Sequence, residues 1–195
     1  MKITTKSCKI YANHLDYRLA WKKGQEKFMG KAFFTAFEFS NFDLQTNKMW
    51  IVKSYDELSK EELYSLLQLR VEVFVIEQDC PYQDVDGKDQ KSIHVWTENE
   101  EGLPIAYLRI VEPGVSYAEP AIGRVVTKES HRKGGIGRKL MLEGIRVINA
   151  VYPGQLIRIS AQEYLLNFYN ELGFEQVGEG YLEDDIPHIE MIKKP

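Results

Sequence analysis

The chain has 195 residues, 44% of them apolar and 28% charged, with a formal net charge of −4. This length suits one globular domain and is short for two, and the composition is ordinary for a soluble protein. No apolar run approaches a membrane span, and the first residues lack the apolar stretch of a secretory signal. Cys8 and Cys80 lie far apart without a CxxC or His cluster, which argues against a disulfide framework or zinc site and favours the reducing cytoplasm.

The charge divides unevenly near residue 48. Residues 1–48 hold nine Lys/Arg and four Asp/Glu (+5), whereas residues 49–195 hold 16 and 25 (−9). Phosphate neutralisation needs clustered cations, so a body this acidic is a poor nucleic-acid binder. It is better suited to attracting an amine-bearing molecule.

Residues 1–48 contain six of the nine phenylalanines but no sustained helical or strand period. We interpret them as an N-terminal extension that is poorly ordered, as termini often are. The alternative is a basic, aromatic arm that docks on the acidic body or on a partner. A domain is expected to begin at residue 49 and to extend to the end of the chain.

The first half of this domain is predicted to form strands around one helix. The helix begins at the capping box Ser59-Lys60-Glu61-Glu62. A loop rich in Asp, Gln, Pro and Gly follows at 77–90, and strands are expected at 50–53, 92–97, 103–111 and 121–127. The buried face of the helix is expected to consist of Leu63, Leu66, Leu67, Val71 and Phe74.

The second half continues with a helix at 135–151, a buried strand at 155–160 and a helix at 164–172 that Gly173 stops. A closing strand pair is expected at 175–178 and 189–192. This order of elements predicts a mixed sheet with helices on both faces. The apolar stripe of the first of these helices is Leu140, Met141, Ile145 and Ile148.

The most informative stretch is the glycine loop Arg132-Lys133-Gly134-Gly135-Ile136-Gly137-Arg138-Lys139. Its place between a strand and a helix collects free N–H groups and the positive end of the helix dipole, and glycines admit a phosphate closely. The four cations suit a pyrophosphate or 3′-phosphate. The spacing is Arg-x-x-Gly-x-Gly, and neither a GxGxxG nor a Walker pattern is present. A glycine-rich connector with solvated basic residues is the alternative interpretation.

A second motif, Phe168-Tyr169-Asn170-Glu171-Leu172-Gly173-Phe174, follows the strand at 155–160. The glycine loop, helix, strand and this motif, in this order, resemble the core of the GNAT N-acetyltransferases. Segments 66–87, 122–126, 160–162 and 181–189 resemble the ElaA-like branch of that superfamily. The resemblance covers 50–193 and none of 1–48. The chain departs from the family pattern at Glu129 and Lys133, where Pro and Gly are usual, and both changes leave the loop spacing intact.

The resemblance implies an α+β fold of three α/β/α layers, with a mixed, mostly antiparallel sheet and a splayed central parallel strand pair. It also implies that acetyl-CoA is the acyl donor, that no metal takes part, and that an amine attacks the thioester directly in a ternary complex. The residues expected to hold acetyl-CoA are Val125, Val126, Thr127, Arg132, Lys133, Gly134, Gly135, Ile136, Gly137, Arg138 and Asn167.

The same resemblance assigns catalytic roles. Tyr169 matches the tyrosine that protonates the coenzyme A thiolate; the alternative is a core aromatic, a role that Phe168 and Leu172 already serve. A backbone N–H at Val126 would polarise the thioester carbonyl. Glu77 and His188 are the leading candidates for the base, and members of this family often use a water chain with no dedicated base. The further candidates for the base are Glu119 and His94.

The acceptor is expected to be an amine-bearing small molecule or peptide. Acidic residues of two segments could guide it, or they could be solvated loop charges. The alternative function is a catalytically weak CoA- or acyl-CoA-binding regulatory module; a nucleotide-phosphate binder explains Tyr169 poorly. The oligomeric state stays open, a homodimer included. The acidic residues are Asp79, Asp84, Asp86, Asp89, Glu183, Asp184 and Asp185.

Overall fold

A computed structural model describes residues 50–195. The predictions for 1–48, a poorly ordered extension or a docking arm, lie outside the described residues. Within the described part of the chain, no helix is long and apolar enough to cross a membrane.

A seven-stranded sheet organises this part of the chain, in the order β1-β2-β3-β4-β5-β7-β6. The central β4–β5 pair is parallel, and every other neighbouring pair is antiparallel. The predicted mixed, mostly antiparallel sheet is therefore confirmed. The strands are β1 Ile51–Ser54, β2 Ser92–Glu98, β3 Pro104–Val111, β4 Ala121–Thr127, β5 Ile157–Gln162, β6 Phe174–Glu183 and β7 Ile186–Lys193.

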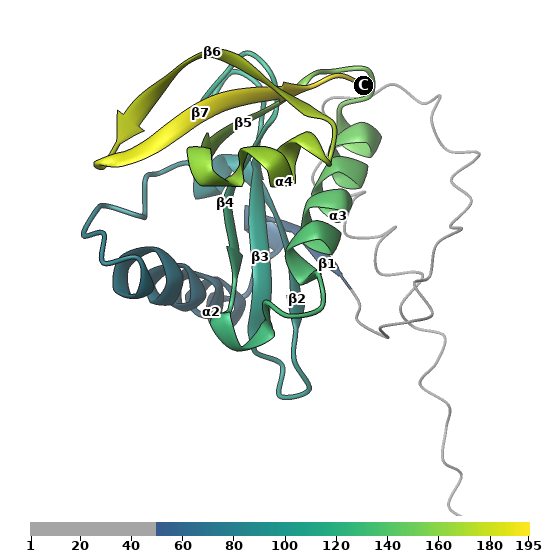
Figure 1. Cartoon of the computed structure of the whole chain (residues 1–195). Helices are drawn as coiled ribbons and strands as arrows, with labels where there is room; N and C mark the ends of the chain where they lie inside the picture. Colours follow the sequence, from purple (N-terminus) through teal and green to yellow (C-terminus); the bar gives the residue numbers. More distant parts are fainter. Residues whose placement is uncertain (1–49) are drawn as a thin grey trace, which may run out of the picture. The chain divides into compact units, whose positions relative to one another are not determined.

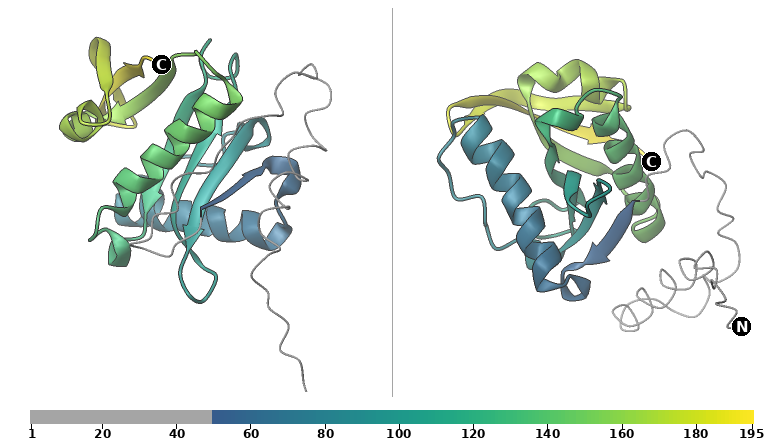
Figure 2. Two further views of the ribbon diagram at one scale, coloured as in Figure 1. Left: turned by 90° about the vertical axis from the view of Figure 1, so that its right-hand side faces the viewer. Right: turned by 90° about the horizontal axis from the view of Figure 1, so that it is seen from below.

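Helices cover both faces of the sheet (Figure 1 and Figure 2). One face carries α2 (Lys60–Arg70), and the opposite face carries α3 (Ile136–Val151) and the short α4 (Leu166–Asn170). All residues of β3 are buried, because both faces of this central strand are covered. The expected three α/β/α layers are thus present.

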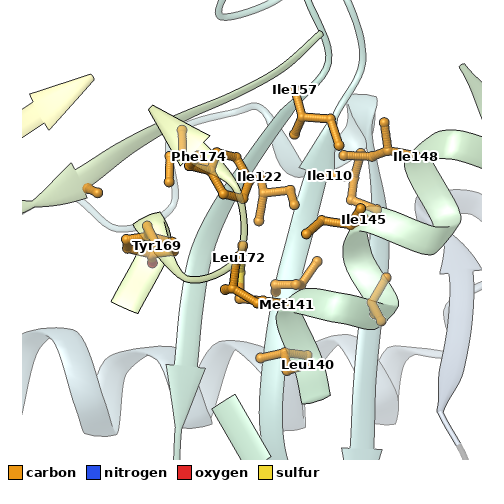
Figure 3. Close-up of a cluster of buried hydrophobic side chains, with 14 of the residues drawn as sticks. Ile110, Ile122, Leu140, Met141, Ile145, Ile148, Ile157, Tyr169, Leu172 and Phe174 are labelled. Carbon is orange, nitrogen blue, oxygen red and sulfur yellow. The ribbon is translucent and has the colours of Figure 1, made fainter. Parts of the chain in front are cut away.

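The larger apolar core lies between the sheet and the α3–α4 layer (Figure 3). The predicted stripe of α3 is buried throughout. Gly144 of α3 is required by this packing, because a Cβ there would lie 2.8 Å from the Leu108 side chain of β3. A second apolar cluster lies under α2 on the other face and consists of Leu66, Leu69, Val73, Trp96, Tyr107 and Val126.

The predicted buried face of the first helix was partly wrong. Leu66 is buried as expected, but so are Leu69 and Val73, while Val71 is 39% exposed. The capping box at Ser59 forms as predicted, and α2 then passes into a π-helical segment, η2 (Val71–Glu77). Leu66, Leu69 and Val73 still follow the helical period, so the prediction placed the buried stripe on a neighbouring face of the same helix.

The C-terminal elements also differ from the prediction. Segment 164–172 is not one helix, because a 3₁₀ turn, η5 (Glu163–Leu165), precedes α4. Strands β6 and β7 are longer than expected and pair almost to the turn that joins them, with a bulge between Val177 and Tyr181. In Figure 1, β5, β7 and β6 lie above the ends of the other strands and turn away from them.

Candidate functional site

The parallel strands β4 and β5 separate almost where they begin. Their register pairs only Ala121 with Arg158. A bulge in β4 accompanies this separation: the register with β3 shifts between Tyr107 and Arg109, and Arg124 has a φ of 51°. Bulges bend a strand and end its pairing. Residues 125–127 therefore have no partner on β5, as the predicted splayed pair requires, and this separation of β4 from β5 is called the opening below.

The glycine loop lies directly beyond the end of β4. Gly134 and Gly135 have φ angles of 99° and 72°, the left-handed region that favours glycine. Gly135 caps α3, and the first bond back to it comes from the N–H of Lys139, at 3.2 Å. The N–H groups of 136–138 precede that bond and, as in any first turn, have no partner within the helix. These N–H groups lie next to the opening, at the end of the helix that favours anions.

Two loop cations expected near a phosphate, Arg132 and Arg138, are engaged by carboxylates. The Arg138 guanidinium lies 3.0 Å from Glu171, at the end of α4. Arg132 lies 2.6 Å from the Glu77 carboxylate and also donates to the Thr127 carbonyl at 3.2 and 3.1 Å. The hydrogen bond and charge of Glu77 raise the pKa of Arg132.

Tyr169 on α4 is 6% exposed. Its ring packs edge-to-face with Phe168 and Phe174 at centroid distances of 5.0 and 6.0 Å, so Tyr169 is also a core aromatic, the alternative interpretation of this residue. Within residues 50–195 its hydroxyl has no hydrogen-bond partner. Burial raises the pKa of Tyr169 to about 12, so the phenol stays protonated at neutral pH. Asn167, on the same helix, is exposed.

His188 lies on β7, opposite Gln162 of β5 and Tyr181 of β6. Its Nδ1 is 2.8 Å from the Ile186 carbonyl. A carbonyl only accepts, so Nδ1 carries the proton and Nε2 of the neutral ring keeps its lone pair. Glu77, the other leading candidate for the base, has both carboxylate oxygens bound by Arg132, which must release it before it can accept a proton.

The remaining candidates for the base have structural partners. His94 is 1% exposed and lies between the Tyr107 hydroxyl at 2.9 Å and the Asp89 carbonyl at 3.1 Å. Burial lowers the pKa of His94. Because this side chain lies inside the fold, the prediction of His94 as a candidate for the base was wrong. Glu119 is paired with Arg158, with distances of 3.2 and 3.1 Å.

The acidic loop does not present its carboxylates as expected. Asp84 and Asp89 are each only 4% exposed, so they are neither an open recognition surface nor solvated charges. Burial alone would raise the pKa of Asp86, but hydrogen bonds and charge from Arg109 outweigh it and hold that pKa well below its usual range. Removing one partner of such a buried network costs about 3–5 kcal/mol. The arginines that bind these carboxylates are Arg70, Arg109 and Arg124.

Sequence and structure comparisons agree with this geometry. A family model described as an acetyltransferase (GNAT) domain matches residues 55–195. Protein ElaA of Escherichia coli K12 is 40% identical over 149 residues, which is 74% of this chain and 95% of ElaA. A UPF0039 protein of Synechocystis is 40% identical over 143 residues, 73% of this chain and 93% of that protein.

Solved structures give the same result. The crystal structure of an acyl-CoA N-acyltransferase from Pseudomonas aeruginosa superposes with a TM-score of 0.72 at 41% identity, covering 75% of this chain and 99% of that one. The crystal structure of E. coli ElaA gives a TM-score of 0.71 at 38% identity, with coverages of 75% and 99%. The GNAT fold implies acyl-CoA binding, and the glycine loop beside the β4–β5 opening fits that ligand. The chain belongs to the GNAT acetyltransferase family, among its ElaA-like members.

Proposed function

We propose that this protein is an acetyl-CoA-dependent N-acetyltransferase that acetylates a primary amine of a small molecule or peptide by direct attack in a ternary complex. The observation that supports this most is the arrangement around the β4–β5 opening. A helix N-terminus that suits phosphate lies at its end, the strand backbone at 125–127 that borders it is not paired with β5, and Tyr169 has an unused hydroxyl in the adjoining core.

Residues of the loop and of β4 would hold the donor. The N–H groups of Gly135, Ile136, Gly137 and Arg138 suit its pyrophosphate, with the Lys133 and Arg138 charges nearby. The backbone of 125–127 suits the amide-rich pantetheine arm, because strand backbone pairs naturally with extended amides. Asn167 is exposed on α4 and available to the same ligand. No metal takes part in this proposal.

The reaction joins the amine nitrogen to the thioester carbonyl carbon and breaks the carbon–sulfur bond. The nitrogen loses a proton, and the sulfur leaves as a thiolate that ends protonated. The raised pKa of Tyr169, about 12, lies above the usual thiol value of about 8.5. The phenol therefore stabilises the departing sulfur chiefly by donating a hydrogen bond, and the amine supplies the net proton of the thiol product.

For the base, His188 is the better supported of the two leading candidates. Its Nε2 lone pair is left free by the Nδ1 contact, whereas Glu77 must first leave Arg132. His188 also lies opposite Gln162, whose amide donates to Gln78 at 3.3 Å. This contact brings Gln78, the residue after Glu77, to the same side of β5 as His188. An acceptor amine is proposed to bind on that side.

The test is release of free thiol from acetyl-CoA with a panel of small and peptide amines. Tyr169→Phe should lower turnover on the order of 10-fold to 10³-fold and leave acetyl-CoA affinity nearly unchanged. Tyr64→Phe is the matched control, because Tyr64 is 72% exposed on α2. Tight CoA binding without turnover on any amine would instead support the regulatory module. Unchanged turnover of Tyr169→Phe, when chemistry limits the rate, would remove Tyr169 from the mechanism.

A further inference from the structure

Glu77 and Arg132 join two segments that are far apart in the chain. Glu77 is the last residue of η2, on the α2 side of the sheet, and Arg132 opens the glycine loop beyond β4. Two N–H···O contacts of 2.6 Å link the two side chains in the fork geometry that arginine and carboxylate prefer. The pair therefore fixes the end of η2 to the start of the loop in one orientation.

The Arg132 side chain is almost fully used by this arrangement. Nη1 and Nη2 bind the Glu77 carboxylate, while Nε and Nη2 donate to the Thr127 carbonyl. These contacts engage four of the five N–H donors of a guanidinium. With Arg132 40% and Glu77 32% exposed, such an ion pair contributes little to the stability of the fold. Its directional contacts point to positioning as its role.

The next residue of the same segment reaches the other strand of the opening. Gln78 accepts a hydrogen bond at 3.3 Å from Gln162, the last residue of β5. Residues 77 and 78 thus connect the loop after β4 with the end of β5, where the two parallel strands have separated. We propose that the Glu77–Arg132 pair is a brace that couples occupancy of the glycine loop to the position of segment 77–80. Its consequence for acceptor binding rests on the acetyltransferase function proposed above.

The physical basis is a short chain of contacts. An anion held by the loop N–H groups restrains the backbone from which Arg132 extends. Arg132 then restrains Glu77 through two hydrogen bonds, and Glu77 restrains the end of η2. Coupling of this kind is reciprocal, so ordering of segment 77–80 also favours the donor. Arg132 and Glu77 act here as positioning residues, and the loop N–H groups contact the donor.

The first test needs no catalysis. Hydrogen–deuterium exchange of peptides covering 71–80 is measured with and without CoA, and CoA affinity is measured by calorimetry. CoA should protect 71–80 in the wild type, and this protection should be lost in Glu77→Gln and in Arg132→Gln. The CoA Kd values of the two variants should agree within about 3-fold, because each removes the same pair. Glu175→Gln, which breaks the exposed pair with Lys194, is the control and should retain the protection.

The second test is kinetic. Both single variants should raise the KM for the amine on the order of 10-fold with a smaller change in kcat, and the double variant should be no worse than either. Retained protection of 71–80 in Glu77→Gln would overturn the brace. So would a loss of CoA affinity in Arg132→Gln more than about 10-fold greater than in Glu77→Gln, since Arg132 would then bind phosphate independently. A wild type without turnover would refute the proposed function, and the exchange experiment would still decide the brace.

Discussion

Replacing Gly137 with Glu should raise the stability of the free protein. Gly137 is the second residue of α3, and a Cβ there would meet only Thr127, at an ordinary 3.7 Å. Glu has a better helix propensity than Gly by about 0.5 kcal/mol. A carboxylate in the first turn gains about 0.3–1 kcal/mol from the helix dipole. The free energy of unfolding should therefore increase by about 1 kcal/mol, which is about 2–4 °C in Tm.

The same substitution should remove donor binding, because it places a carboxylate among the N–H groups proposed for the pyrophosphate. Two unit charges 4 Å apart repel by about 4 kcal/mol at a partly buried site, or roughly 10³-fold in Kd. Calorimetry with CoA measures this loss, and thermal denaturation without ligand measures the stability. Gly137→Ala is the control, because it keeps the gain in helix propensity and adds no charge. Wild-type CoA affinity in Gly137→Glu would refute the assignment of the loop, and a lower Tm would refute our account of Gly137.

Two further predictions follow from the carboxylates and from the domain boundary. Arg109 holds the pKa of Asp86 in the folded protein below its unfolded value of about 3.9. The stability that ionised Asp86 provides is therefore fully present well above pH 3.9 and is lost as the pH falls below that value. Asp86→Asn should therefore show a shallower fall of Tm between about pH 5 and pH 3, and an unchanged slope would argue against this linkage. Removal of residues 1–48 should leave Tm and acetyl transfer nearly intact, since the family match begins at residue 55. A large fall in Tm on truncation would instead show that the extension stabilises the domain.

The features that sequence reasoning predicted well are local ones. The capping box at Ser59 is complete within four residues, and the glycine loop takes its conformation from Gly134 and Gly135 themselves. The stripe of α3 follows the regular helical period over 16 residues. Each of these is decided by neighbours in the chain, so residue type and spacing were sufficient.

The features that were missed depend on partners distant in the chain. The acidic loop reads as solvated or as a recognition surface, because nothing in its own sequence shows that Arg70 and Arg109 will meet it. Arg70 extends from α2 and Arg109 from β3, and their contacts with Asp89 form only once both elements pack. The sequence shows an arginine in the helix and several aspartates in the loop. The apolar pattern of the helix, however, did not predict that Arg70 would be buried.

This buried network bears on the site through Arg124. Arg124 occupies the β4 bulge with a φ of 51°, a conformation that costs a non-glycine residue about 1–2 kcal/mol. Its Nε lies 2.8 Å from Asp84, and its guanidinium lies over the Phe74 and Tyr82 rings at 5.9 and 5.4 Å. These contacts hold the side chain of the strained residue and thereby offset the strain. The bulge accompanies the separation of β4 from β5, so Asp84, first interpreted as amine recognition, instead helps to hold the strand conformation beside the gap where the donor is proposed to bind.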